Sequence, residues 1–298
     1  MRIDLLTGTV YAYGPMPARP PTLLVFDSGL GGLTVLAELR QVRPDARFIY
    51  AADDAGFPYG RFDEERLAER VTLVVERLIA RHAPDLVVVA CNTASTVNIV
   101  LPHLRSRFDV PFVGTVPPIK PAAALSRSRL ISVLATPGTV ARAYTKRLID
   151  AHAGDCQVKL VGSPRLAELA TAELCGEAVR DEDVLSEIAP AFIRDGERQT
   201  DVIALGCTHY PLLLARFERL APWPVTWIDP APAIAKRVVQ LLGEAPAGHA
   251  PASSAVAVFT NGAAVAPELR AALAQRGLAT IASEPVPLAA ANALTLQV

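Results

Sequence analysis

Short apolar runs alternate with longer amphipathic segments along most of the chain, and this alternation constrains the fold more than any other feature. A run that is apolar at every position is typical of a strand buried on both faces of a parallel sheet. Nine such strands are predicted, over residues 22–27, 47–51, 85–90, 111–116, 130–135, 157–162, 202–206, 225–229 and 256–260. Helical periodicity with charges on one side predicts helices over 63–82, 139–152 and 181–196. Alternating strands and helices predict an α/β protein with right-handed crossovers.

Two proline-rich stretches mark points where the chain is expected to cross between domains. They are VPPIKP at 116–121 and APWPVTWIDPAP at 221–232. Two crossings predict that one domain is inserted into another, which is then discontinuous. The predicted parts are an N-terminal extension at 1–21, a first α/β domain at 22–118 plus 228–298, and a second α/β domain at 119–227.

The composition disfavours several classes of protein. The chain has 298 residues, of which 51% are hydrophobic, enough for a sizeable core. Its 29 basic and 30 acidic residues leave a formal net charge of −1, and no basic stripe is interleaved with aromatic residues, so we expect no nucleic-acid partner. No apolar run approaches the roughly 18 residues of a membrane helix, so we expect no membrane partner. Four cysteines without a CxxC pair, and no signal peptide, predict a cytoplasmic protein.

Polar, small or glycine-bearing motifs follow the predicted strands. In an open α/β sheet, ligands bind beyond the carboxyl ends of the strands. The motifs are DSGLGG at 27–32, DDAGFPYG at 53–60, CNTAS at 91–95, TPGT at 136–139 and CTHYP at 207–211. We therefore expect these motifs to line the functional site.

Two of the motifs are alike, and one lies in each predicted domain. Each gives an apolar strand, then a cysteine (Cys91 or Cys207), then hydrogen-bonding residues. This weak repeat predicts two pseudo-symmetric, Rossmann-like domains, each a mostly parallel sheet flanked by helices, with a thiol on each side of an interdomain cleft. A cofactor-free racemase needs two such thiols, because inversion removes a proton from one face of a stereocentre and returns one to the other. Cys156 and Cys175 lie in ordinary contexts and are interpreted as structural.

Both motif cysteines precede an expected helix start. The positive end of a helix dipole favours a nearby anion, so we expect the thiolates to be favoured and their pKa values to fall below the usual value of about 8.5. Backbone N–H groups at these helix starts, with the neighbouring asparagine and threonine side chains, are candidates to hold a substrate carboxylate.

Each of these residues also has a simpler interpretation. Buried cysteines are often only structural, Asp27 can cap the following helix, and His209 can be a core histidine. The pair Cys207 and His209 offers too few ligands for zinc, and a redox pair is more often CxxC. Pyridoxal phosphate needs a Schiff-base lysine, and nothing around Lys120 resembles a phosphate cup. We therefore predict no cofactor and no metal.

Six motifs, in order, resemble the glutamate racemase family within the aspartate/glutamate racemase superfamily. They are VFDSGLGGLTVL, ADDAGFPYG, ACNTAS, GTVPPIKPA, LATPGT and LGCTHYPLL, within about residues 22 to 242. The resemblance implies a two-domain, cofactor-independent isomerase that interconverts L- and D-glutamate and supplies D-glutamate for peptidoglycan synthesis. It implies glutamate as the small-molecule partner, and it admits a peptidoglycan-precursor activator and a homodimer.

The resemblance also implies roles for residues at matching positions. Cys91 would take the α-proton of D-glutamate and Cys207 that of L-glutamate, with Asp27 assisting Cys91 and His209 assisting Cys207. Tyr59 would use its hydroxyl as well as its backbone on the side-chain carboxylate. The implied substrate-binding residues are Asp27, Ser28, Tyr59, Gly60, Asn92, Thr93, Thr208 and His209.

One position departs from the family pattern. The family commonly has a glutamate in the second domain that supports the histidine, and an ungapped match from Ser163 and Pro164 places Thr171 there. Glu168 and Glu173 are nearby acids that a small shift would bring into that place.

Two other functions remain open. A related cofactor-independent racemase acting on aspartate or a hydantoin would use the same two-thiol chemistry. A binding protein that keeps the fold, such as an inhibitor of a DNA enzyme, is disfavoured by the near-neutral charge and by the presence of both cysteines.

Overall fold

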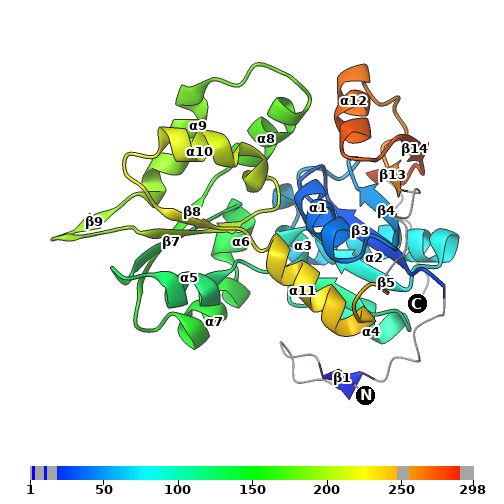
Figure 1. The fold of residues 1–298 in the computed structure, drawn as a ribbon, viewed down its shortest axis with the longest axis horizontal. Helices are drawn as coiled ribbons and strands as arrows, with labels where there is room; N and C mark the ends of the chain where they lie inside the picture. The colour runs from blue at the N-terminus through cyan, green and yellow to red at the C-terminus, as the bar shows by residue number, and fades with distance from the viewer. Residues whose placement is uncertain (1, 4–9, 12–18, 247–254, 289–298) are drawn as a thin grey trace.

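Two parallel sheets lie side by side in the computed structural model, which describes residues 2–3, 10–11, 19–246 and 255–288 (Figure 1). The larger sheet has the strand order β14-β13-β4-β3-β5-β6, and the smaller has the order β12-β11-β7-β8. Every neighbouring pair within these two sheets is parallel. The prediction of an α/β fold with mostly parallel sheets flanked by helices is confirmed.

The strands begin and end close to the predicted apolar runs. The larger sheet contains β3 (Thr22–Asp27), β4 (Arg47–Ala52), β5 (Leu86–Val89), β6 (Phe112–Gly114), β13 (Ala255–Phe259) and β14 (Thr280–Ser283). The smaller sheet contains β7 (Leu130–Ala135), β8 (Gln157–Gly162), β11 (Val202–Gly206) and β12 (Thr226–Ile228). Of these ten strands, β14 was not predicted, because its short segment is only partly apolar and partly exposed.

Helices connect and cover the strands. Around the larger sheet they are α1 (Leu33–Val42), α2 (Glu64–His82), α3 (Asn92–Ser95), α4 (Val100–Arg107), α11 (Ala231–Leu242), α12 (Pro267–Gln275) and the 3₁₀ turn η1 (Tyr59–Arg61). Around the smaller sheet they are α5 (Ile119–Leu125), α6 (Pro137–Ala141), α7 (Ala143–His152), α8 (Leu166–Leu174), α9 (Asp181–Ile188), α10 (Leu214–Leu220) and the 3₁₀ turns η2 (Ala189–Ala191) and η3 (Tyr210–Leu213).

The central strands of each sheet are buried on both faces, which explains why they are almost wholly apolar. In β3, Leu23 and Val25 join the core beneath α1 and α11, whereas Leu24 and Phe26 join the core beneath α2 and α4. The smaller sheet is covered by α5 and α7 on one face and by α8, α9 and α10 on the other (Figure 1). The carboxyl ends of all ten strands are therefore the places left for ligand-binding side chains.

The chain passes between the two sheets twice. It leaves the larger sheet after β6 and reaches α5 through Pro117 and Pro118, and it returns from β12 to α11 through Asp229 and Pro230. Both passages lie beside the predicted boundaries of the 119–227 domain. The division into these domains remains a prediction.

The predicted helix over 139–152 is interrupted. Two helices, α6 and α7, occupy this segment, and Arg142 between them has an extended backbone with φ −72° and ψ 142°. The side chain of Thr136 caps α6 by accepting from the backbone N–H of Thr139. The break turns Arg142 toward the larger sheet, where it contacts the segment that follows Cys91.

The predicted helix over 181–196 is too long. It ends at Ile188 and gives way to one 3₁₀ turn, because Pro190 has no backbone N–H to donate and cannot continue the helix. The segment then turns into the two-residue strand β9 (Arg194–Asp195), which pairs with β10 (Arg198–Gln199). Gly196 provides the left-handed conformation, with φ 61°, that this tight turn requires.

Part of the predicted extension at 1–21 falls within the described residues. The strands β1 (Arg2–Ile3) and β2 (Val10–Tyr11) form an antiparallel pair. Arg19 donates to the carboxylate of Asp85 at 2.8 Å and so ties the end of this segment to the start of β5. The rest of the extension lies outside the described residues.

Candidate active site

The predicted site residues stand at the carboxyl ends of strands from both sheets. Asp27 is the last residue of β3, Cys91 follows β5, and Cys207 directly follows β11. All of the predicted site residues except Gly60 are buried. The two motifs with cysteines therefore meet in the interior, and most of their polar groups must find partners there.

Asp27 connects the two sheets. Its carboxylate accepts from the backbone N–H of Ser28 at 2.7 Å and from that of Gly32. It also accepts from the hydroxyl of Thr208, 3.2 Å away, which belongs to the motif after β11. Asp27 is thus more than a helix cap, since its second oxygen also bonds to the opposite sheet's turn.

The glycines of DSGLGG permit this close approach. A Cβ atom on Gly31 would lie 2.4 Å from Nδ1 of His209 and 2.5 Å from its backbone nitrogen. A Cβ on Gly32 would lie 3.0 Å from Cβ of Asp27. The loop is therefore built to pack against the motif after β11, and its glycines are needed for contact between the two sheets.

Cys91 is linked to Asp27 through a hydroxyl group. Its Sγ lies 3.5 Å from Oγ of Ser28, and that Oγ lies 3.4 Å from Oδ1 of Asp27. Burial, and then the charge of Asp27, raise the pKa of the Cys91 thiol to about 12. The hydrogen bonds from Ser28 and from the backbone of Ala94 act in the opposite direction.

Cys207 faces an imidazole. Its Sγ lies 3.9 Å from Nδ1 of His209, and burial raises the pKa of the thiol. Burial also lowers the pKa of His209, while Asp27 opposes that shift. A neutral imidazole beside a thiol can accept its proton, which is the arrangement required for acid–base chemistry.

The expectation that the pKa values of the two thiols fall below the usual value is wrong for this structure. The helix after Cys91, α3, has four residues, and the segment after Cys207 begins as the 3₁₀ turn η3. Backbone N–H groups at these starts do lower the two pKa values, but burial outweighs them. A buried thiol is costly to ionise, so each thiol needs a nearby proton acceptor.

Two buried polar atoms at the site have no hydrogen-bond partner among the described residues. They are Nδ2 of Asn92 and Nε2 of His209. Oδ1 of Asn92 accepts from Thr115 at 3.4 Å, so only its donor side is free. An unsatisfied buried polar group costs roughly 1–3 kcal/mol, and a bound ligand or water would remove that cost.

Two residues of the segment after Cys91, Thr93 and Thr96, are held by side chains from the second sheet and its helices. The hydroxyl of Thr93 is 3.1 Å from that of Thr136, at the end of β7. The buried guanidinium of Arg142 donates to the carbonyl oxygen of Thr93 at 2.7 Å and to the hydroxyl of Thr96 at 3.0 Å. Sequence reasoning did not identify Arg142, because it looks like one charge in an amphipathic helix.

Tyr59 and Gly60 are placed differently from the expectation. Tyr59 is buried, and its hydroxyl donates to Oδ2 of Asp53 at 2.6 Å, so the predicted use of this hydroxyl on a substrate is not supported by the geometry. Gly60 is exposed, and a Cβ there would meet nothing within 4 Å. The backbone of this segment is left as the group that can face a ligand.

Neither acid expected near His209 reaches it. Glu168 pairs with Arg61 at 2.9 Å, and Glu173 pairs with Arg216 at 2.7 Å. The ring of Phe57, 5.3 Å between centroids, packs against the imidazole instead. In the described part of the chain, the carboxylate that acts on the charge of His209 is that of Asp27.

Two kinds of feature are absent from the described residues. No group of three or more histidine, cysteine, aspartate or glutamate side chains there could hold a metal ion. None of the helices there is long and apolar enough to cross a membrane.

Known proteins are similar to this chain in sequence and in fold. A family model described as Asp/Glu/Hydantoin racemase matches residues 34–238. The glutamate racemase of Brucella anthropi is 56% identical over 236 residues, which cover 78% of this chain and 84% of that protein. That of Brucella ovis is 54% identical over 235 residues, 77% of this chain and 84% of that protein.

Solved structures give the same result. The Escherichia coli glutamate racemase, in complex with L-glutamate and the activator UDP-MurNAc-Ala, superposes with a TM-score of 0.80 at 42% identity, over 90% of this chain and 99% of that chain. The glutamate racemase isoform RacE1 from Bacillus anthracis superposes with a TM-score of 0.71 at 26% identity, over 90% of this chain and 98% of that chain. These matches define an amino-acid racemase, which is an isomerase. The chain belongs to the Asp/Glu/hydantoin racemase family.

Proposed function

We propose that this protein interconverts L- and D-glutamate without a cofactor, through two cysteine thiols. One observation carries the proposal. Cys91 contacts Ser28 and Cys207 directly precedes Thr208, and the hydroxyls of both Ser28 and Thr208 contact the carboxylate of Asp27, although the two cysteines come from different sheets. Each thiol has its own proton acceptor within reach. Glutamate as the substrate is supported by the names of the similar proteins.

The reaction from D-glutamate begins with Cys91 as thiolate and Cys207 as thiol. Cys91 removes the α-proton from one face, and Cys207 gives its proton to the other face, which leaves L-glutamate, a protonated Cys91 and a Cys207 thiolate. To reset the enzyme, the proton on Cys91 passes through Ser28 to Asp27 and on to solvent, while His209 takes up a proton from solvent and passes it to the Cys207 thiolate. Racemisation of L-glutamate starts from the opposite protonation pattern.

The substrate itself helps to form the thiolate. The charge of Asp27 is the second cause of the raised pKa of Cys91. A substrate ammonium group near Asp27 and Ser28 would offset that charge and favour the Cys91 thiolate.

The α-proton of an amino acid is only weakly acidic, and the buried surroundings of the site help to stabilise the charge that its removal creates. Charge that develops on the substrate is stabilised by fixed donors in a site from which water is excluded. Nδ2 of Asn92 is such a donor, with no partner among the described residues, and the side chains of Thr93 and Thr208 lie at the same strand ends. We propose that these residues hold the α-carboxylate and amine, and that the backbone at Tyr59 and Gly60 takes the distal carboxylate.

An activator site is also proposed. A cavity of about 300 Å³ lies where the two passages between the sheets meet, with Pro117 and Pro230 in its lining. Arg105, Lys120 and Arg237 also line it and give it positive charge, which suits a diphosphate. We expect UDP-MurNAc-Ala to raise kcat, and Lys120→Glu to weaken this response more than it changes the activity without activator.

Supply of D-glutamate for peptidoglycan is the cellular role that this activity would serve. A cytoplasmic location and a homodimer stay predictions. Sedimentation of the purified chain would test the second of these.

The proposed function is tested by following both chirality and proton exchange. The protein, freed of pyridoxal phosphate and metals, is incubated with L-glutamate in D₂O, and the α-proton is followed by NMR and the optical activity by circular dichroism. We expect both signals to decay together. If glutamate is unchanged with UDP-MurNAc-Ala present while aspartate or a hydantoin racemises, the substrate assignment is wrong.

A further inference from the structure

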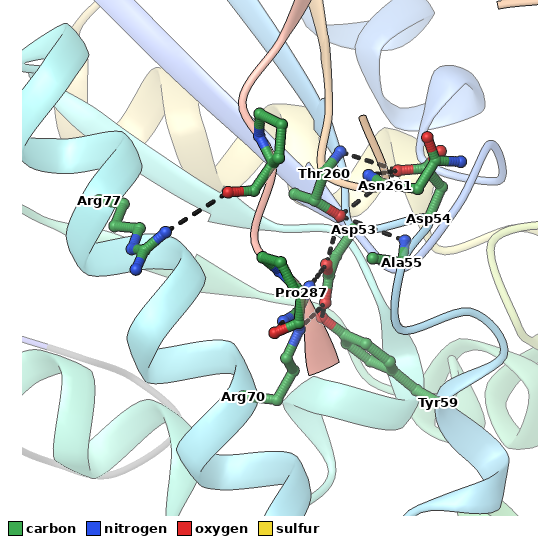
Figure 2. A network of polar contacts seen from close by, with 10 residues as sticks. Asp53, Asp54, Ala55, Tyr59, Arg70, Arg77, Thr260, Asn261 and Pro287 are labelled. Carbon is green, nitrogen blue, oxygen red and sulfur yellow. Dashed lines mark hydrogen bonds and ion pairs between the residues drawn. The ribbon is translucent and has the colours of Figure 1, made fainter. Parts of the chain in front are cut away.

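A fully buried carboxylate, Asp53, stands at the start of the loop that carries Tyr59 and Gly60 (Figure 2). Arg70 of α2, also fully buried, donates to both of its oxygens, with 2.8 Å from Nε to Oδ2. Thr260, directly after β13, donates its hydroxyl to Oδ1 at 2.6 Å. A charged group buried so completely is stable only with such partners, so the geometry around Asp53 is tightly fixed.

The third residue that donates to this carboxylate is Tyr59, whose hydroxyl makes the fourth hydrogen bond. It donates to Oδ2 at 2.6 Å, beside Nε of Arg70 (Figure 2). A phenol has one proton, and here that proton bonds to Asp53. Tyr59 therefore anchors its loop to the core through its side chain, while its backbone remains at the loop surface.

The loop closes tightly around Asp53. The backbone N–H of Gly56 donates to the carbonyl oxygen of Asp53 at 2.9 Å. A Cβ atom on Gly56 would lie 2.8 Å from Oδ2 of Asp53 and 2.9 Å from the ring of Tyr59, so only glycine fits there. The next residue, Phe57, packs its ring on His209. Displacement of Asp53 would thus shift the segment that faces the cleft.

Thr260 fixes the loop from a strand that lies outside the cleft motifs. Its hydroxyl also accepts from the backbone N–H of Ala55 at 3.2 Å. The carboxylate of Asp54 in turn accepts from the backbone N–H groups of Thr260 at 2.8 Å and Asn261 at 3.0 Å. The loop is therefore fixed to the end of β13 by hydrogen bonds that each segment both donates and accepts.

The same network reaches the C-terminal part of the described chain and the catalytic aspartate. Arg70 donates to the carbonyl oxygen of Pro287 at 3.3 Å, and Arg77 to that of Pro285 at 3.4 Å (Figure 2). The backbone N–H of Asp53 donates to the carbonyl oxygen of Asp27 at 2.8 Å. Asp53 thus stands between the residue proposed to assist Cys91 and the loop proposed to hold the substrate.

We infer that Asp53, held by Arg70 and Thr260, is a positioning residue that sets the Tyr59–Gly60 backbone for the distal carboxylate of the amino acid. The hydroxyl of Tyr59 acts through Asp53 and does not contact the substrate. This inference rests on the proposed function, since it assigns the group that positions one end of a dicarboxylic substrate.

Two substitutions test the inference by removing one hydrogen bond each from the same carboxylate. Tyr59→Phe deletes the phenol proton next to the cleft, and Thr260→Val deletes a hydroxyl on the far side while it keeps the shape of the side chain. Thr260→Ser keeps the hydroxyl and is the matched control. Asp53 and Arg70 are left intact, because removal of one partner would strand a buried charge and threaten folding.

We expect Tyr59→Phe and Thr260→Val each to raise KM for glutamate about tenfold, with kcat changed by less than about threefold. Because both act through one group, the double variant should raise KM by less than the product of the single effects. Thr260→Ser should restore the KM of the unmodified protein. A purely structural role would lower stability in Thr260→Val without this selective change in KM.

Three results would overturn the inference. One is a raised KM in Tyr59→Phe with an unchanged KM in Thr260→Val, which would put the hydroxyl on the substrate. The second is independent effects that multiply in the double variant, and the third is failure of Thr260→Ser to restore KM. An unmodified protein that does not racemise glutamate would instead reject the proposed function, so the two failures are distinguishable.

Discussion

Cys91 and Cys207 follow similar buried strands, yet their thiols contact different chemical groups. Cys91 reaches a hydroxyl, Ser28, that leads to the carboxylate of Asp27. Cys207 reaches the imidazole of His209. Burial raises both thiol pKa values, so both sides face the same energetic problem. The repeat that is visible in the sequence therefore extends to the fold and the thiols, but not to the groups that move protons to and from them.

The two sides are joined at one point. Asp27 belongs to the Cys91 side, but it accepts a hydrogen bond from Thr208 and opposes the lowered pKa of His209. One carboxylate therefore influences the protonation of both halves. We therefore expect a substitution beside one thiol to alter the protonation of the groups beside the other thiol, through Asp27.

Loss of either motif thiol should have the largest effect. Cys91→Ala and Cys207→Ala should each lower racemisation by at least about 10³-fold, because a proton-transfer group has no substitute on that face. Cys156→Ala and Cys175→Ala are matched controls and should remain near normal. Initial rates from both enantiomers, with circular dichroism of the fold, check this. Normal racemisation by Cys207→Ala would remove the CTHYP motif from the mechanism.

Substitution of Ser28 beside Cys91 and of His209 beside Cys207 should have different effects on the two enantiomers. We expect Ser28→Ala to lower kcat/KM about tenfold and His209→Asn about 10²-fold. Because the two enantiomers have equal free energy, kcat/KM must fall equally in both directions. The asymmetry should appear in the α-deuterium isotope effect, which should rise for D-glutamate in Ser28→Ala and for L-glutamate in His209→Asn. A rise for the same enantiomer in both variants would show that each thiol does not have its own partner.

The next prediction concerns Arg142, which supports the Cys91 side of the site from the second sheet. Its Nη1 holds the carbonyl oxygen of Thr93 beside Cys91 while its Nε pairs with Glu64, and a single lysine ammonium cannot reproduce this two-nitrogen geometry. We expect Arg142→Lys to raise KM about tenfold, with a smaller change in kcat. Arg147→Ala is the control, since Arg147 also crosses between the sheets, to Asn98, but its bond is exposed and worth little. Equal effects of the two variants on KM would contradict a special role for Arg142.

The smallest predicted effect concerns stability and pH. Burial lowers the pKa of His209, so the unfolded chain takes up this proton at a higher pH than the folded one. The free energy of unfolding should therefore fall as the pH drops below about 6.5, by at most about 1.4 kcal/mol per pH unit from this group. Denaturant titrations at several pH values should show a shallower fall in His209→Asn than in the exposed control His103→Asn. Equal slopes in the two variants would contradict the lowered pKa.

The alternation of apolar runs and amphipathic segments was enough to predict the α/β class and nine of the ten strands of the two parallel sheets. The run 202–206 has no polar side chain, and the run 130–135 has only Ser132, because helices cover both faces of each strand; the bounds of both strands are confirmed. The helix over 181–196 was overextended because the effect of Pro190 was missed, although the proline was visible. The break at Arg142 was not visible, since it depends on contacts with residues about 46 to 49 positions away.

Site residues were predictable when the signal was local. Cys91 and Cys207 stand directly after apolar strands, where chemistry is expected in an α/β sheet. The direction of the Tyr59 side chain was not predictable, because its hydroxyl is drawn inward by Asp53. Asp53 is fixed in turn by Arg70, 17 positions away, and by Thr260 at the end of β13, 207 positions away. Burial also reversed the expected thiol pKa values, and burial at this depth is a property of the packed sheets.

The central claim is that the two thiols act on opposite faces of one carbon, and single-cysteine variants in D₂O test it most directly. Cys207→Ala should exchange the α-proton of D-glutamate for deuterium without inversion, while leaving L-glutamate unexchanged. Cys91→Ala should do the reverse. If both variants exchange the same enantiomer, or if either still inverts glutamate at the rate of the unmodified protein, the two-face account is contradicted.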